Sequence, residues 1–312
     1  MIFTTITKKC IILKEQYSGE EMKKTQAIIL LIAVFAARGT SFLFSKELLQ
    51  TMGPLSILGW RFISAFIILA LIFHKKLFAC SKKSLFGGVV LGILYTVCMV
   101  LEMFGLKTVD TGTSALIENM AIVLVPIFVG ILTKSFPKKK TLFCAALAII
   151  GVAFLSFSQG ASGSGGIGIV LTILAAVCYA FCIMATEKVS RDADPLTVGM
   201  IQLGVMGVLS FLVSLPVEGF SPPGGTREWL LLLFLIFLCS CFGFAFQPLG
   251  QKYLPAETAA ILTVVNPFTA SILGFVVAKE GINATKIAGY AFILLALIIY
   301  NLNIKGKKSK NE

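Results

Sequence analysis

Charged residues are scarce in this chain: only 13% of its 312 residues are Asp, Glu, Lys or Arg, whereas soluble proteins average about 25%. Hydrophobic residues make up 57%, which excludes an ordinary soluble globule. Acidic residues number 15 against 27 basic ones, giving a formal net charge of +12. In a soluble protein this excess would suggest nucleic acid as a partner. Here the lysines lie between apolar runs, where they set membrane orientation, and no nucleic acid is expected.

Signatures of catalysis are also lacking. The single histidine, His74, ends an apolar run among lysines. The sequence contains no glycine-rich phosphate loop, nucleophile elbow or cluster of metal ligands. Most of its eight cysteines lie inside apolar runs, where a thiol behaves as a small hydrophobe. We therefore expect no enzyme, cofactor or metal site, and any uphill transport has to be driven by an ion or solute gradient.

Long apolar runs, in contrast, fill the chain. A helix needs roughly 20 apolar residues to cross a bilayer, and these runs predict an all-α polytopic membrane protein with ten transmembrane helices. The predicted spans are 26–46, 55–73, 85–106, 112–133, 141–158, 166–187, 195–216, 229–249, 257–278 and 284–303.

Basic residues concentrate in alternate loops, and this asymmetry predicts orientation. The richer set begins with the lysines of segment 1–24 and ends with the tail 305–312, so both termini are expected in the cytoplasm, with the protein in the plasma (bacterial inner) membrane. Between them this set holds Lys75, Lys76, Lys82, Lys83, Lys134, Lys138, Lys139, Lys140, Lys188, Arg191 and Lys252, whereas the other loops hold Lys46, Lys107, Arg227, Lys279 and Lys286.

The chain divides into two similar halves, 25–158 and 166–304, joined by a small-residue linker, 159–165. Pro54-Leu55 recurs as Pro195-Leu196, and Pro126 recurs as Pro267 at the same spacing. Five spans are an odd number, so the second copy enters the membrane inverted. Inverted repeats are typical of transporters, with the substrate site near the midplane. Segment 1–24 is expected to be disordered or to lie on the membrane surface, and Met22 is an alternative start to Met1.

Ionisable residues within spans are costly and are therefore candidates for function. Arg61, which follows Trp60, and Glu118 lie at similar depth from the outer ends of their spans. They predict either a substrate or proton-coupling site or a structural ion pair. For Glu102, placed near the outer interface within reach of water, the structural pair is favoured.

Further polar residues lie within spans. They predict either a polar cavity or hydrogen bonds between helices. Pro126 and Pro267 lie inside two matching spans, where proline bends the axis, and predict either a gating pair or static kinks. The polar residues are Thr113, Ser114, Asn119, Gln202, Gln247 and Asn266.

Several stretches, in this order and spacing, resemble the EamA-type ten-helix members of the drug/metabolite transporter superfamily. They are Arg38-Gly39-Thr40-Ser41-Phe42, Pro54-Leu55 with Arg61-Phe62, Gly105-Leu106-Lys107 through Val125-Pro126, and Lys279-Glu280 with Gly289. The resemblance implies alternating access through a central cavity between two five-helix bundles. It also implies export of amino acids, metabolites or drugs, and leaves open which of them is the substrate.

One departure from the family pattern concerns Arg38, which stands where the family usually has tryptophan, while its mate in the second half, Tyr179, stays aromatic. Arg38 is then either a substrate determinant, for example for an anion, or a damaging change. The expected substrate-binding residues are Arg38, Trp60, Arg61, Thr113, Glu118, Asn119, Tyr179, Gln202 and Asn266, with Pro126 and Pro267 in gating.

The favoured function is a secondary transporter of small organic solutes, working as an exporter and with protons as a candidate coupling ion. The alternative is a passive channel or a lipid-handling membrane protein. A receptor or scaffold is disfavoured because the sequence has no sizeable soluble domain.

Overall fold

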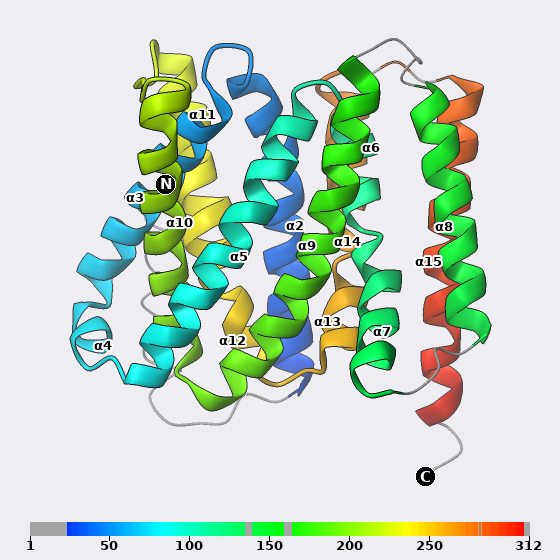
Figure 1. Cartoon of the computed structure of the whole chain (residues 1–312), viewed down its shortest axis with the longest axis horizontal. Coiled ribbons are helices and arrows are strands. Elements are labelled where there is room, and N and C mark those ends of the chain that lie inside the picture. Colours follow the sequence, from blue (N-terminus) through cyan, green and yellow to red (C-terminus); the bar gives the residue numbers. More distant parts are fainter. Residues whose placement is uncertain (1–23, 135–138, 159–163, 280, 282, 309–312) are drawn as a thin grey trace.

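The computed structural model describes residues 24–134, 139–158, 164–279, 281 and 283–308 (Figure 1). Across these residues the chain is helical, with short turns and no strand, which confirms the predicted all-α membrane fold. Segment 1–23, the linker residues 159–163 and the tail residues 309–312 lie outside the described part. The helices are α2 (Lys24–Leu48), α3 (Pro54–Ile72), α4 (His74–Phe78), α5 (Lys82–Leu106), α6 (Thr111–Glu118), α7 (Ala121–Leu132), α8 (Lys139–Ser158), α9 (Ser164–Asp192), α10 (Pro195–Val217), α11 (Thr226–Phe234), the π-helix η1 (Leu235–Phe244), α12 (Gln247–Gln251), α13 (Ala256–Leu262), α14 (Val265–Val276) and α15 (Ala284–Lys308).

A helix or a run of helices occupies every stretch predicted as a span. Within the described residues, eight of these stretches are long and apolar enough to cross a membrane, and two shorter apolar helices cover Leu142–Leu155 and Ala284–Ala296. Pro216, the last residue of the predicted span 195–216, lies inside the last turn of α10. A proline is tolerated there because the surrounding turns keep their hydrogen bonds, and Glu218 N–H still bonds to Ser214 O at 2.9 Å.

Helix starts follow local chemistry. Pro54 and Pro195 each occupy the first turn of a helix, where the missing N–H costs nothing. Asp194 caps α10 by accepting a bond from Thr197 N at 3.0 Å. The cap of α3 comes from far along the chain, because the Glu218 carboxylate accepts bonds from the N–H groups of Leu55 and Ser56, both at 3.1 Å. A carboxylate at a helix N-terminus also suits the helix dipole.

The two spans that contain Pro126 and Pro267 are broken rather than bent. The first divides into α6 and α7 around Asn119, and the second into α13 and α14 around Thr263. Pro267 lies in the first turn of α14, just after its break, whereas Pro126 lies further inside α7.

The two breaks are joined to each other. Pro267 has no N–H to offer the carbonyl of Thr263, which a continuous helix would require. Asn119 Nδ2 donates to that carbonyl oxygen at 2.8 Å instead. In return, the Thr263 hydroxyl contacts Asn119 Oδ1 at 2.5 Å. One amide therefore satisfies the oxygen that the proline leaves free.

The eighth predicted span is irregular in a different way. It passes from α11 into η1, a π-helix, and then into α12. π-helical turns are rare and are frequent at functional sites. Gly243 on η1 lies directly against Arg38, since a Cβ there would come within 2.9 Å of Arg38 Cγ. The wide turns of η1 thus bring its backbone close to a buried charge.

Helices of the two halves interleave. Within the described residues the closest packing joins α3 with α10, α5 with α9 and α10, and α8 with α15. Small residues allow these approaches. At Gly207, for example, an added Cβ would lie 2.6 Å from the backbone nitrogen of Ile63.

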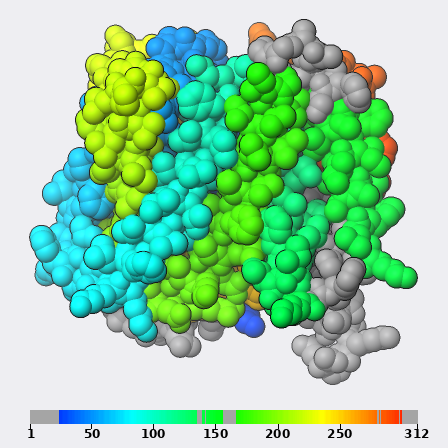
Figure 2. All heavy atoms as spheres, in the orientation of Figure 1, coloured from blue at the N-terminus to red at the C-terminus, as the bar shows by residue number. Residues whose placement is uncertain are grey.

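The outer surface is apolar, as a bilayer requires. In Figure 2 the cyan α5 and the green α9 lie side by side across the middle of one face. Both helices carry large exposed hydrophobic residues, among them Phe86 and Ile93 of α5 and Val170 and Phe181 of α9. The start of α2 and the end of α15 lie at the same edge of the molecule, together with α4 (Figure 1).

Candidate functional site

Four ionisable residues predicted within spans form one group at the centre of the molecule, here called the central cluster: Arg38 (α2), Arg61 (α3), Glu102 (α5) and Glu118 (α6). All are at most 3% exposed. Charge interactions link Arg38 to both carboxyl groups and Arg61 to Glu102. None of the ion pairs found among the described residues, taken as N–O separations up to 4.0 Å, joins members of this cluster. The arginines and carboxylates therefore lie near one another without closing on each other.

Arg38 is held by neutral groups. Its Nη1 donates to Gln247 Oε1 at 2.7 Å and to Tyr179 Oη at 3.0 Å. Its guanidinium carbon lies 4.2 Å from the ring centre of Phe244 and 4.9 Å from that of Tyr179, within the range of cation–π attraction. A charge at mid-span costs at least about 2.5–3.5 kcal/mol on insertion scales, and these contacts offset that cost.

Arg61 also lies close to Phe244. Its guanidinium carbon is 5.5 Å from the centre of that ring and 5.0 Å from the ring of Phe62. Its Nε donates to Ser240 Oγ of η1 at 2.7 Å. Its Nη2 is buried with no hydrogen-bond partner. A buried donor without a partner is costly, so this atom is available to a ligand.

The carboxyl groups are also incompletely satisfied. The carboxyl groups of Glu102 and Glu118 lie within hydrogen-bond reach of each other, so one of them, when protonated, can donate to the other. Apart from that contact, both oxygens of Glu118 and one of Glu102 are buried without a hydrogen-bond partner. The placement of Glu102 near water was wrong: its side chain is 3% exposed, because α9, α10 and the start of α6 cover α5. Two cations and two acids thus share a buried volume in which both donor and acceptor atoms are unpaired.

A second layer of hydrogen bonds fixes the surroundings of Arg38. Gln247 Nε2 donates to Tyr95 Oη at 2.9 Å and to Gln251 Oε1 at 3.1 Å. Gln251 Nε2 in turn donates to Ile183 O at 3.4 Å. The Tyr95 ring packs edge-on against Phe244 and Tyr179, with centroids 5.7 Å and 6.4 Å away. This network orients the Gln247 amide so that its oxygen faces Arg38.

Most of the other predicted site residues are buried near the central cluster or on the helices that carry it, whereas Trp60 is not. Asn266 lies near the central cluster, because its backbone packs against Gly39, the residue after Arg38. A Cβ added to Gly39 would lie 2.6 Å from the backbone oxygen of Asn266. Thr113 and Ser114 are buried on α6, the helix of Glu118, and Gln202 is buried on α10 with its Oε1 unpartnered. Asn119 bonds to Thr263 and so connects the break between α6 and α7 to the break between α13 and α14.

Trp60, in contrast, lies apart from the central cluster. Its Nε1 donates to Ser221 O at 3.0 Å, and its ring stacks on Phe220 with centroids 5.2 Å apart. The edge of Trp229 completes this group. Such an arrangement is typical of an aromatic belt at the membrane–water interface.

Sequence reasoning missed Tyr95, Ser240 and Phe244. Phenylalanine is too common in the spans of this chain to single out one ring, and Ser240 is an ordinary small residue. Tyr95 left a usable signal: it lies two helical turns from Glu102, on the same face of one span.

Among the described residues no group of three or more His, Cys, Asp and Glu side chains is placed to hold a metal ion.

Comparison with known proteins agrees with the architecture. The sequence model of the EamA-like transporter family matches this chain twice, over residues 25–157 and 166–302. YyaM, an uncharacterized transporter of Bacillus subtilis, is 26% identical over 293 residues, covering 89% of this chain and 94% of the relative. The threonine/homoserine exporter RhtA of Escherichia coli is 22% identical over 291 residues, covering 91% of this chain and 93% of the relative.

A solved protein structure shares the fold, with a TM-score of 0.65 and 16% identity over 89% of this chain and 97% of the other. The names of the relatives indicate transporters rather than enzymes. The two family matches together cover most of the sequence. The chain therefore belongs to the EamA-like transporter family, within the drug/metabolite transporter superfamily.

Proposed function

We propose that this protein is a secondary transporter that exports small organic solutes, with amino acids as the foremost class, and that the central cluster is its substrate site. The observation that carries the proposal is the set of buried, unpartnered donors and acceptors on Arg61, Glu102 and Glu118. Buried polar atoms are normally paired, so a ligand that pairs them is stabilised in this position.

The balance of charge favours a zwitterion. The α-carboxylate of an amino acid accepts bonds from Arg61 Nη2, and its α-ammonium donates to the Glu118 carboxylate. The similarity to the threonine/homoserine exporter RhtA supports the same class. Arg38 is a built part of this site rather than a damaging change, because two hydrogen bonds and an aromatic ring hold it.

Ten spans arranged as two inverted five-helix repeats, 25–158 and 166–304, provide the framework for alternating access. The double family match supports this arrangement. So does the pattern of packing, in which α2 against α14 corresponds to α9 against α6 and α7, and α5 against α10 corresponds to α3 against η1. Arg38 also contacts its own repeat mate, Tyr179, as residues near a twofold axis do.

Transport requires the cluster to open to each side in turn, whereas here every member is buried. The breaks joined by Asn119 and Thr263 are the points at which α6 and α13 move relative to α7 and α14. Pro126 and Pro267 act in this gating, since each removes a backbone hydrogen bond that would otherwise stiffen the half-helix.

Energy comes from a gradient of protons or of another solute, and Glu118 is the proton-coupling residue. Both termini lie in the cytoplasm, with the protein in the plasma membrane. The richer supply of lysines on the side of α4, where α2 starts and α15 ends, supports this orientation.

Counterflow in proteoliposomes tests the function. Vesicles loaded with one unlabelled solute are diluted into a trace of the same labelled solute, over a panel of threonine, homoserine, other amino acids, nucleosides and cationic dyes. We expect transient accumulation of labelled amino acid above equilibrium, which a carrier produces and a channel does not. Equilibration without overshoot for every solute would contradict a carrier.

A further inference from the structure

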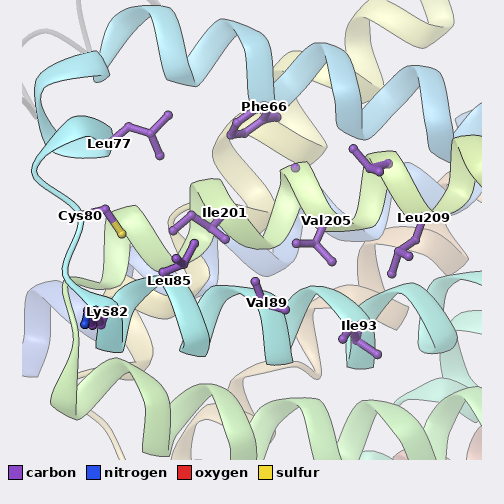
Figure 3. A pocket seen from close by; sticks show the side chains of 12 residues that line it. Phe66, Leu77, Cys80, Lys82, Leu85, Val89, Ile93, Ile201, Val205 and Leu209 are labelled. Atoms are coloured by element: carbon purple, nitrogen blue, oxygen red, sulfur yellow. The ribbon is translucent and has the colours of Figure 1, made fainter.

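An apolar groove runs along the outside of the molecule, away from the central cluster. Its volume is about 780 Å³, within the roughly 300–1,000 Å³ of sites for small ligands. Figure 3 shows Phe66 of α3 on one side, Leu85, Val89 and Ile93 of α5 on the other, and α10 as the floor. It is lined by Phe66, Leu77, Cys80, Lys82, Leu85, Val89, Ile93, Ile201, Gly204, Val205, Val208 and Leu209.

A polar pocket of about 510 Å³ adjoins the end of this groove. Cys80 lines both hollows, and Ser81 of the pocket precedes Lys82 of the groove. The pocket lies at the ends of helices, between the α4–α5 turn, the α9–α10 turn and Lys252 after α12. The two hollows thus form one continuous surface, apolar along the spans and polar at their ends.

Cations outnumber acids around the polar end. Lys76, Arg191 and Lys252 line the polar pocket, against Asp192 and Asp194. Lys82, which follows Ser81 of the pocket, lines the adjoining end of the groove. Two of the cations are already engaged: Lys76 pairs with Asp194 at 3.8 Å, and Arg191 pairs with Glu187. The ammonium groups of Lys82 and Lys252 take part in no ion pair found among the described residues.

We propose that the groove and the pocket together bind one anionic phospholipid. An acyl chain lies in the groove between α3 and α5 over α10, and the phosphate contacts Lys82 and Lys252, with Lys76 beside them. Charge complementarity selects the occupant: basic pockets at the ends of spans attract anionic headgroups, while the hydrocarbon lining excludes a soluble anion from the groove. The lipid bridges α3 and α5 of the first half to α10 of the second.

Cys80 makes this proposal measurable, because a bound lipid covers its thiol. The protein is reconstituted in vesicles of phosphatidylcholine alone or with added phosphatidylglycerol, and maleimide labelling of Cys80 is followed by peptide mass spectrometry. We expect labelling to slow as phosphatidylglycerol increases, with half-protection at a defined mole fraction. The experiment measures no transport, so its outcome is independent of the proposed function.

Variants separate a specific site from general surface charge. Lys82→Ala with Lys252→Ala should raise the phosphatidylglycerol fraction needed for half-protection by about fivefold per lysine removed. Lys134→Ala with Lys139→Ala removes the same charge at another part of the same end of the molecule and should leave protection unchanged. Thermal unfolding of each variant in detergent verifies that it is folded.

Three outcomes would overturn the proposal. Equal labelling in both lipids excludes a site selective for anionic lipid. Protection by inorganic phosphate in phosphatidylcholine vesicles assigns the polar pocket to a free anion. Protection that follows the protein-to-lipid ratio rather than phosphatidylglycerol assigns the groove to a second copy of the chain.

Discussion

The two halves of this transporter differ most where they face each other. The first half supplies every charge of the central cluster. The corresponding positions of the second half, at the spacing that separates Arg38 from Tyr179, are uncharged: Tyr179, Gln202, Gly243 and Ala259. The other buried charge among the described residues, Lys286, pairs at 2.7 Å with Asp110, the residue before α6, and not with a member of the central cluster.

This contrast indicates a division of labour on one scaffold. Charged groups need neutral partners to hold them open for a ligand, because arginines and carboxylates that paired directly would satisfy each other. Tyr179, Gln247 and Phe244 hold Arg38 from the second half. In the proposed function, the charged half contacts the substrate, and the neutral half holds those charges in position.

The largest expected effect comes from the charged half. Arg38→Gln should lower counterflow by about 30-fold or more, since removing one partner of a buried charge group costs about 2–5 kcal/mol. Lys286→Gln, which removes a buried charge outside the cluster, is the control and should retain most of the rate once expression is matched. If both variants lost counterflow activity equally, the central cluster would have no special role compared with a buried charge elsewhere.

Glu118 tests the coupling role of the same half. Glu118→Gln should abolish the dependence of transport on pH while leaving counterflow, which needs no gradient, measurable. The removed carboxyl is the group that takes up and releases the proton. Flux and counterflow are measured from about pH 5.5 to about pH 8.5, a range in which a buried carboxyl group can titrate. An unchanged pH profile would contradict proton coupling through Glu118.

The neutral half should give smaller effects. Tyr179→Phe keeps the ring over the Arg38 guanidinium and removes one hydrogen bond to a charged group, so counterflow should fall by about tenfold. Trp60→Phe, at the interface and apart from the cluster, should transport at close to the wild-type rate. If Tyr179→Phe lowered counterflow as much as Arg38→Gln, the neutral half would also contact the substrate.

The joined breaks allow a double-variant test of stability. Asn119→Ala leaves the Thr263 carbonyl without its donor and should cost about 1 kcal/mol of unfolding free energy. Pro267→Ala restores an N–H at the position that serves this carbonyl, so the two changes together should cost less than their sum. Thermal unfolding in detergent provides the measurement, and strict additivity would show that Asn119 does not compensate for the proline.

Much of this arrangement was accessible from the sequence. The spans and the four buried charges follow from hydropathy. An ionisable residue in an apolar run is costly, so its presence there indicates either a functional site or an ion pair. Arg38 and Tyr179 were both expected in the substrate site, but the hydrogen bond between them was not predicted.

The partners of those charges were not accessible. Phe244 and Ser240 are placed by the π-helical turns of η1, and such a change of helical period leaves no mark in hydropathy. The breaks in the fourth and ninth spans were predicted only as bends, because the bond between Asn119 and the Thr263 carbonyl joins residues far apart in sequence. Trp60 immediately precedes Arg61 along the chain, yet adjacent helical positions point to different faces, and Trp60 lies apart from the central cluster.

Direct binding tests the central claim most closely. Purified wild-type protein, Arg38→Gln, Arg61→Gln and Lys286→Gln are titrated with the labelled amino acid that shows counterflow. The account predicts saturable binding to the wild type and to Lys286→Gln, and loss of binding in Arg38→Gln and Arg61→Gln. Undiminished binding to both cluster variants would place the substrate elsewhere and contradict the account.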